Sequence, residues 1–185
     1  MLPTLPTPRR SEEAFSDRDL VACMRAGDPL VWESVFTQHY AQLVQFASSY
    51  VARPIAEDLA QDVFLAIWQN RERWNPEGGI RAYLFAAVRN RALKSLERSA
   101  VARKTARKSG PSAVSSTSIE DVEKIVRAQF DDMPERNRVV FLLRWTIGMK
   151  DPEIAFVLGK TIDGVEKDEA RGLRWLARRL GILRK

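Results

Sequence analysis

The sequence has very few of the residues that most metal and thiol chemistries require. Among 185 residues there is a single cysteine, Cys23, and a single histidine, His39. This scarcity excludes a disulfide framework, a zinc site of cysteine and histidine, and a cysteine–histidine nucleophile pair. We expect Cys23 to be a small core residue on an apolar helix face, and His39 to be packed or at the surface. The sequence therefore predicts no metal site, no cofactor and no catalytic residue.

Long apolar runs are also missing. No stretch approaches the roughly 18 to 20 apolar residues that a membrane span needs. Residues 1–16 lack the apolar segment of a secretory signal. Hydrophobic residues make up 45% of the chain and charged residues 29%, which is ordinary for a globular protein. The sequence thus predicts no membrane insertion and a cytoplasmic location.

The positive charge is unevenly distributed. The net charge is +6, yet residues 1–98 carry 12 basic and 12 acidic side chains. Residues 99–118 carry four basic side chains and no acid, and residues 119–185 carry 14 basic and 12 acidic ones. Between residues 81 and 108, nine basic residues face one acid, Glu97. A phosphate backbone would be attracted to this stretch.

Aromatic residues accompany the basic stretch. Trp74, Tyr83 and Phe85 lie in it or beside it. Aromatic faces close to positive charge can stack on unpaired bases. A solvated basic helix above core aromatics would give the same pattern, so the composition alone leaves both interpretations open.

The spacing of apolar residues predicts an all-α fold. They recur at intervals of three and four, and no alternating run is bounded by hairpin turns. Residues 99–118 are small, rich in Ser and Thr, and basic, which is typical of a flexible linker. We therefore expect a flexible tail over residues 1–16 and two small helical domains over residues 17–98 and 119–185.

The first domain is expected to contain four helices. Asp17 is placed to cap the first helix, and a Gly-Asp-Pro turn at residues 27–29 separates it from the second. A break at Pro54 precedes the third helix, whose apolar stripe is Leu59, Val63 and Ile67. The fourth helix covers about residues 80–98, with basic side chains directed outward. The first domain thus ends in a helix with a strongly basic face.

The second domain shows the pattern of a helix-turn-helix. Ser118 is predicted to begin a helix, and a further helix over residues 139–147 is followed by Gly148. A short helix, a turn at Gly159 and a longer helix capped by Thr161 then complete the pattern. This arrangement is typical of duplex DNA-binding domains.

The order of these elements resembles the extracytoplasmic-function group of bacterial sigma factors. The resemblance is carried by AEDLAQDVF (residues 56–64), AAVRNRAL (residues 86–93) and MPERNRVVFLL (residues 133–143), and it covers nearly everything from Asp17 onward. It implies region 2-like and region 4-like domains in a subunit that is not an enzyme. The implied partners are the RNA polymerase core enzyme and promoter DNA, both duplex and single-stranded non-template strand. An anti-sigma factor is left open.

The resemblance also assigns roles to residues of the first domain. Five match the surface that docks on the clamp coiled coil of the polymerase: Asp58, Gln61, Asp62, Leu65 and Gln69. Ten match the part that recognises and melts the minus-ten element: Trp74, Asn75, Gly78, Gly79, Arg81, Tyr83, Asn90, Arg91, Lys94 and Arg98. The loop over residues 74–80 would capture a flipped base, since its glycines permit close backbone approach. Asn90 would read base edges, and the cations would hold phosphates.

The final helix departs from the family pattern. Residues 162–170 hold four acids and one base, a sign that repels DNA. Either the minus-thirty-five element is contacted by Lys160, Thr161, Lys167, Arg171 and Arg174, or this domain serves a protein partner. A stand-alone dimeric helix-turn-helix regulator is the alternative function, although no dimer seam is evident. A nucleic-acid enzyme would need a carboxylate cluster that the spacing does not provide.

Overall fold

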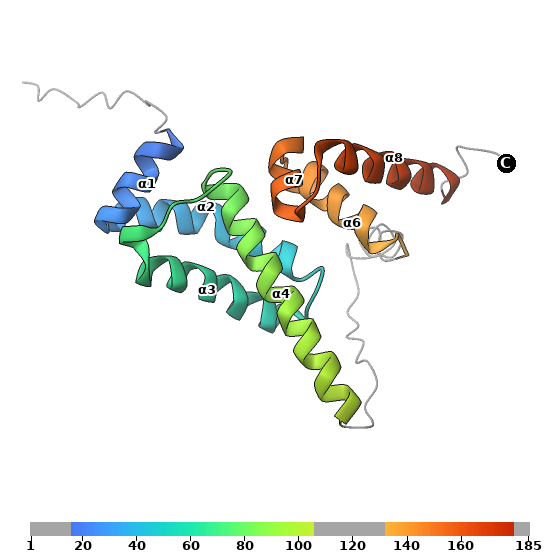
Figure 1. Cartoon of the computed structure of the whole chain (residues 1–185), viewed down its shortest axis with the longest axis horizontal. Helices are drawn as coiled ribbons and strands as arrows, with labels where there is room; N and C mark the ends of the chain where they lie inside the picture. Colours follow the sequence, from blue (N-terminus) through green and yellow to red (C-terminus); the bar gives the residue numbers. More distant parts are fainter. Residues whose placement is uncertain (1–15, 106–131, 180–185) are drawn as a thin grey trace, which may run out of the picture.

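Every element in the described part of the chain is helical. The computed structural model describes residues 16–105 and 132–179, with only the backbone described for residues 100–105. The N-terminal module consists of α1 (Asp17–Ala26), α2 (Pro29–Ala47), α3 (Arg53–Gln69), the 3-10 turn η1 (Arg71–Arg73) and α4 (Ile80–Thr105). The C-terminal module consists of α6 (Glu135–Phe141), the π-helical turn η2 (Leu142–Thr146), α7 (Asp151–Leu158) and α8 (Ile162–Arg179) (Figure 1). The all-α fold class, with a helix-turn-helix formed by α7 and α8, is confirmed.

Local sequence signals set the ends of the first helices. Gly27 ends α1 in the left-handed conformation, with a φ of +78°, and the Asp28 side chain accepts hydrogen bonds from the first turn of α2. The cap of α1 was predicted wrongly, because Ser16 is the N-cap and accepts from the backbone N–H of Asp19 at 3.3 Å. Asp17 lies one residue inside the helix, which leaves its carboxylate available for another partner.

The core of the N-terminal module lies between α2, α3 and α4. Leu43, Phe46 and Leu84 are fully buried there. The predicted stripe of α3 is confirmed, since Val63 and Ile67 are buried and Leu59 is half-buried. Burial of these apolar faces is the main force that holds the three helices together.

The two residue types that are scarce in the sequence both pack in this module. Cys23 is half-buried on α1, and His39 is buried on α2. Burial and the nearby charge of Arg81 lower the pKa of His39, although the charge of Asp17 acts in the opposite direction. His39 is thus a packed residue at the point where α2 faces the ends of α1 and α4.

The last helix of the N-terminal module is longer than predicted. We expected it to end near residue 98 and the linker to begin at residue 99, but α4 continues to Thr105. Ala100 to Lys104 contain no Gly or Pro that would stop a helix. The remainder of the expected linker, and the helix expected to begin at Ser118, lie outside the described residues.

The C-terminal module follows its predicted turns closely. Pro134 precedes α6, and Gly148 and Gly159 end the next two helical stretches with φ of +74° and +62°. The Thr161 side chain accepts from the backbone N–H of Gly164 at 3.1 Å, which confirms the predicted cap of α8. The helix expected over residues 139–147 is not regular, because its second half widens into the π turn η2.

Gly172 allows α8 to approach α6 closely. A Cβ atom built on Gly172 would lie 2.5 Å from Cε2 of Phe141, which is buried. The sequence analysis did not single out Gly172. The two modules also meet, because α7 packs against α4 (Figure 1).

Candidate functional site

One face of α3 is exposed and carries all five residues predicted to bind the polymerase. The members of this α3 face are Asp58, Gln61, Asp62, Leu65 and Gln69. Leu65 is 53% exposed, an unusual position for a leucine that sits beside a buried stripe. Phe64, the neighbour of Leu65 in the chain, is buried in the core. The α3 face therefore combines acidic, amide and apolar groups on one rigid helix.

Aromatic side chains of α2 border the α3 face, and sequence reasoning missed them. The rings of Phe36 and Tyr40 stack at 4.7 Å, and the Trp32 and Trp68 rings meet edge-on at 5.1 Å. Phe36 and Trp68 remain substantially exposed. Trp32, Phe36 and Tyr40 recur every four residues along α2, and this spacing was the sign in the sequence that they share one face. Core residues of a helix have the same spacing, so the sequence did not distinguish a surface role from a core role.

The loop after α3 is fixed by contacts from distant helices. Arg25 of α1 donates to the carbonyl oxygen of Trp74 at 2.7 Å and to the side-chain oxygen of Asn75 at 3.4 Å. The Asp17 carboxylate accepts from the backbone N–H of Ile80 at 3.1 Å and so caps α4. A Cβ on Gly79 would lie 2.5 Å from that carboxylate, and the φ of Gly79 is +90°. Glycine is therefore required at residue 79 for the cap to form.

A cavity of about 340 Å³ lies between α3, this loop and α4. Four of the residues predicted to contact the minus-ten element line it: Trp74, Asn75, Tyr83 and Arg91. Six others also line it: Val63, Ala66, Ile67, Asn70, Arg73 and Ala87. The Trp74 and Tyr83 rings meet edge-on at 5.6 Å. The cavity thus offers aromatic faces, amides and two guanidinium groups, which suit a planar polar ligand with a nearby negative charge.

Trp74 itself is buried, which the sequence did not indicate. It is only 5% exposed, and its indole N–H has no hydrogen-bond partner among the described residues. A buried donor of this kind is rare because it loses its bonds to water. The indole therefore acts as part of the cavity wall and not as an exposed stacking platform.

The outer face of α4 is basic and accessible. Asn90, Lys94 and Arg98 are exposed, and Arg91 is half-buried at the cavity. The second half of α4 extends away from the rest of the molecule (Figure 1). These side chains therefore form a single ridge that leads from the cavity, a geometry that suits a phosphate backbone.

The remaining two predicted residues of the minus-ten group contact the C-terminal module, although Gly78 itself stays exposed. Arg81 donates to the backbone carbonyl oxygens of Ile147 and Gly148. A Cβ built on Gly78 would lie 3.0 Å from the ring of Phe156 on α7. The structure thus brings four of the ten residues around the cavity, leaves three exposed along α4, and places Gly78 and Arg81 at a contact between modules, with Gly79 at the Asp17 cap.

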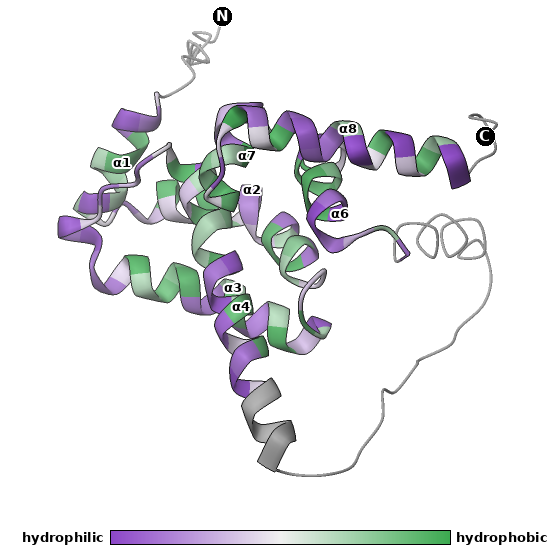
Figure 2. Ribbon diagram, turned by 45° about the vertical axis from the view of Figure 1, so that its right-hand side comes forward, coloured by the Kyte–Doolittle hydropathy of each residue, from purple (hydrophilic) through white to green (hydrophobic). Residues whose placement is uncertain are grey.

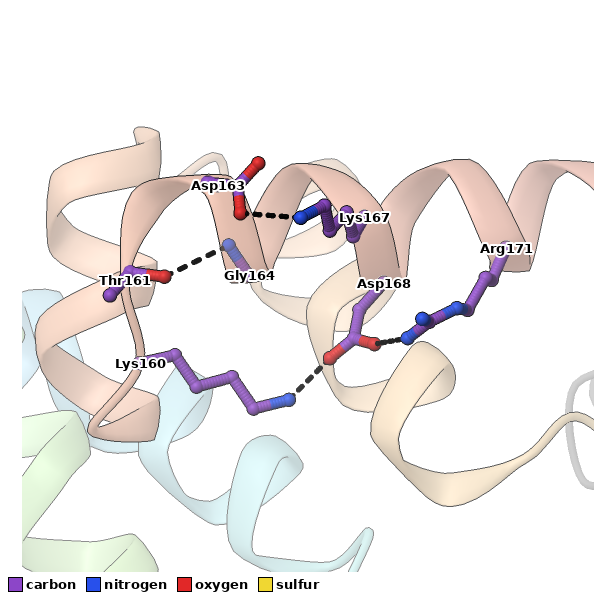
Figure 3. A network of polar contacts seen from close by, with 7 residues as sticks. All are labelled: Lys160, Thr161, Asp163, Gly164, Lys167, Asp168 and Arg171. Carbon is purple, nitrogen blue, oxygen red and sulfur yellow. Dashed lines mark hydrogen bonds and ion pairs between the residues drawn. The ribbon is translucent and has the colours of Figure 1, made fainter.

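The residues predicted to contact the minus-thirty-five element are engaged in local contacts. Lys160 and Arg171 both pair with Asp168, and Lys167 pairs with Asp163 at 2.8 Å (Figure 3). Thr161 caps α8, whereas Arg174 is exposed. Hydrophilic and hydrophobic residues alternate along α8 (Figure 2). Three of the four predicted cations, Lys160, Lys167 and Arg171, are therefore paired with acids of α8.

The acids of α8 were expected to give the helix a DNA-repelling charge, but two of the four do not lie free on its surface. Asp168 is 4% exposed, and Glu169 pairs with Arg144 of η2 at 3.0 Å. Burial alone would raise the pKa of Asp168, but the hydrogen bonds and charges of Lys160 and Arg171 outweigh it and lower that pKa. Asp168 therefore presents no unpaired negative charge at the surface of α8, because Lys160 and Arg171 balance the charge of its carboxylate. Glu166 is exposed and makes no ion pair with the described residues.

No group of three or more His, Cys, Asp or Glu side chains in residues 16–105 and 132–179 is placed to hold a metal ion. Within the same ranges, no helix is both long and apolar enough to cross a membrane. The cavity, the α3 face and the α4 ridge remain the features that a function must explain.

Comparisons with known proteins agree with this geometry. Residues 35–101 match sigma-70 region 2, a stretch that contains the α3 face, the cavity and the α4 ridge. The chain is 26% identical over 167 residues to the RNA polymerase sigma factor CnrH of Cupriavidus metallidurans, which covers 82% of this chain and 87% of CnrH. The resemblance inferred from the sequence is confirmed.

Two solved structures share the fold. The structure of CnrH in complex with the cytosolic domain of CnrY matches with a TM-score of 0.64 at 24% identity, and covers 90% of this chain and 97% of that chain. The sigma factor RpoE in complex with the anti-sigma factor NepR, from Bartonella quintana, matches with a TM-score of 0.62 at 19% identity, and covers 82% of this chain and 98% of that one. Both likenesses extend over the two modules described above.

Proposed function

Since the chain carries a sigma-70 region 2 domain and is homologous to sigma factors of the extracytoplasmic-function group, we propose that it directs RNA polymerase to promoters and stabilises the melted minus-ten strand. It acts in the cytoplasm as a binding subunit of the core enzyme and has no catalytic residue of its own. Both structural relatives are sigma factors solved with a bound regulator. An anti-sigma factor is therefore included among the proposed partners.

The observation that carries this proposal is the cavity between α3, the 74–75 segment and α4. Its volume of about 340 Å³ is ample for one nucleobase. Asn70 and Asn75 offer donors and acceptors to the edge of a base, and Trp74 and Tyr83 offer ring surface. A flipped base in this cavity would place the adjoining backbone beside Arg91 and the α4 ridge.

The α3 face supports the docking half of the proposal. Its acidic groups, with Leu65 and the neighbouring aromatic rings, form a mixed polar and apolar surface of the kind that protein partners bind. The α4 ridge lies on a different helix, so core enzyme and promoter DNA can be bound at the same time. A stand-alone helix-turn-helix regulator would need neither the α3 face nor the cavity.

Docking is tested with the double variant Asp58→Lys and Asp62→Lys. Both side chains are exposed, so the fold should survive while the sign of the α3 face reverses. We expect co-purification with core polymerase to be lost. The matched control, Glu33→Lys with Glu72→Lys, makes the same charge change at two exposed acids outside α3 and should still co-purify. Unchanged co-purification of the α3 variant would count against the docking assignment.

The cavity is tested by filling it. Ala87 lines the cavity, so Ala87→Phe removes space without removing a polar group. On a promoter selected from a random-sequence library with the wild-type chain, we expect this variant to bind core polymerase normally and to lose open-complex formation, measured by permanganate reactivity of the minus-ten thymines. Ala86→Phe, on the same helix but not in the cavity wall, is the control. Normal melting by Ala87→Phe would refute base capture in this cavity.

A further inference from the structure

Arg25 connects α1 to the loop beside the cavity. It lies in the last turn of α1, and its Nε donates to the carbonyl oxygen of Trp74 at 2.7 Å. Its Nη2 donates to Oδ1 of Asn75 at 3.4 Å. The other end of α1 holds the end of the same loop, since the Asp17 carboxylate accepts from the backbone N–H of Ile80. Helix α1 therefore fixes the loop at both ends, although no described residue of α1 lines the cavity.

The contact with Arg25 decides which end of the Asn75 amide is left for a ligand. Asn75 lines the cavity, and a primary amide has one accepting end and one donating end. Because a guanidinium can only donate, Arg25 engages the amide oxygen and leaves the NH2 group for a ligand. The amide of Asn70 is turned the opposite way, since its Nδ2 donates to the carbonyl oxygen of Ala66 at 2.9 Å and its oxygen is left over. The two amides of the cavity thus present opposite ends.

The other polar side chains of the cavity wall are mostly donors. Arg73 and Arg91 carry guanidinium groups, which have no acceptor, and the indole of Trp74 offers only its N–H. That N–H is buried without a hydrogen-bond partner among the described residues. The hydroxyl of Tyr83 can donate or accept. With the Asn75 amide held as it is, the cavity best matches a base that has a carbonyl oxygen, which cytosine, thymine and guanine have and adenine lacks.

We propose that Arg25 is a positioning residue that sets the base preference of the cavity, an inference that rests on the proposed function. Arg25 holds the Asn75 amide with its NH2 group toward the captured base. That group donates to a carbonyl oxygen, but it meets the amino group of adenine as a second donor, and two donors form no hydrogen bond. Without Arg25 the amide is free to rotate and to offer its oxygen to adenine. Arg25 therefore disfavours adenine without touching the base.

The test measures base preference with the full chain bound to core polymerase. The probes are fluorescein-labelled single-stranded DNAs that carry the non-template minus-ten segment of the library-selected promoter, with each of the four bases at each position in turn. Their affinities are measured by anisotropy. Arg25→Met removes the guanidinium and keeps an unbranched side chain, and Arg18→Met removes the same charge at an exposed site of α1 as the control. Asn75→Asp replaces the NH2 group by a second acceptor, and it tests the same preference if the Arg25 variant does not fold.

We expect the wild-type holoenzyme to bind adenine about tenfold less tightly than the preferred base at one position, the size of one mismatched contact. Arg25→Met should reduce this ratio to about threefold or less at that position alone, and Asn75→Asp should reduce or invert it, whereas Arg18→Met should keep it.

A wild type that does not disfavour adenine, or an unchanged ratio in Arg25→Met or Asn75→Asp, would overturn the inference. An equal loss of affinity for all four bases in Arg25→Met would also overturn it, because a purely structural role weakens every base alike. Failure of the proposed function has a different signature, since the wild-type holoenzyme would then bind none of these strands and would not open the promoter.

Discussion

Asp168 gives the sharpest test of how the C-terminal module is held together. This carboxylate is 4% exposed and accepts from Lys160 and, at 3.0 Å, from Arg171 (Figure 3). Lys160 lies in the turn before α8, whereas Arg171 lies one turn along the helix from Asp168. Asp168→Asn keeps the size of the side chain and removes its charge. Lys160 and Arg171 then lose their counter-charge, and the salt bridge that joins the turn at Lys160 to α8 is lost.

The expected cost follows from the exposure of the two partners. Hydrogen bonds to charged groups contribute about 1.5 to 3 kcal/mol each when water is excluded. The Lys160 and Arg171 side chains are 33% and 52% exposed, so water replaces much of what they lose. We therefore discount each bond to about 0.5 to 1 kcal/mol. Asp168→Asn should lower the free energy of unfolding by about 1 to 2 kcal/mol.

The same interaction makes stability depend on pH. Because the pKa of Asp168 is lower in the folded chain than its ordinary value of 3.8, the stabilisation is complete above that value. It is lost as the pH falls through the lower, folded-state pKa. In urea titrations followed by circular dichroism, the difference between wild type and Asp168→Asn should be full at pH 7 and should shrink below about pH 4.

The control is Glu166→Gln, two residues away on the exposed side of α8. It removes one negative charge without disturbing an ion pair of the described residues, and its free energy of unfolding should stay within about 0.5 kcal/mol of wild type. Equal stability of Asp168→Asn and wild type at pH 7 would refute the structural role of Asp168. A loss that persists unchanged at pH 3 would refute the charge as its cause.

Three further predictions concern DNA binding and packing. Glu166→Lys should tighten duplex binding by the holoenzyme, because Glu166 is the exposed acid of the central part of α8; unchanged affinity would indicate that α8 does not approach phosphates. Gly172→Ala should destabilise the chain by about 1 kcal/mol despite the better helix propensity of alanine, because its Cβ would press on Phe141; a stabilised variant in urea titration would contradict this packing. Lys94→Ala with Arg98→Ala should reduce the salt slope of promoter affinity by about two, and a loss confined to one base position would show base reading instead.

Whether the position of a site residue could be predicted depended on how far apart in the sequence its contacts lie. The exposed face of α3 was predictable, because the side chains at i, i+4 and i+8 of a helix share one face. The cavity was not, because Asn70, Arg73 and Ala87 come from three separate elements that only meet after folding. The burial of Trp74 was missed for the same reason. An aromatic residue in a polar loop gives no local sign of the helices that will cover it.

The sequence by itself determined the helices and most of their ends. The helix ends are set by the caps at Asp28 and Thr161 and by the left-handed glycines at 148 and 159. Each of these signals acts on residues no more than four positions away, so it can be read from the sequence without knowledge of the tertiary structure. The tertiary structure decided which charges face the solvent. The four acids of residues 162–170 predicted a helix that repels DNA, yet Asp168 is buried and its charge is balanced by ion pairs with Lys160 and Arg171.

The tertiary structure also gave Asp17 and Arg81 roles that no local pattern contains. Asp17 was expected to cap its own helix, but it caps α4, 63 residues away in sequence. Arg81 was expected to meet DNA, but here it donates to a helix end of the other module. A charge can be counted from the sequence, but its partner is chosen by burial, which brings together groups far apart in the chain and excludes water from between them.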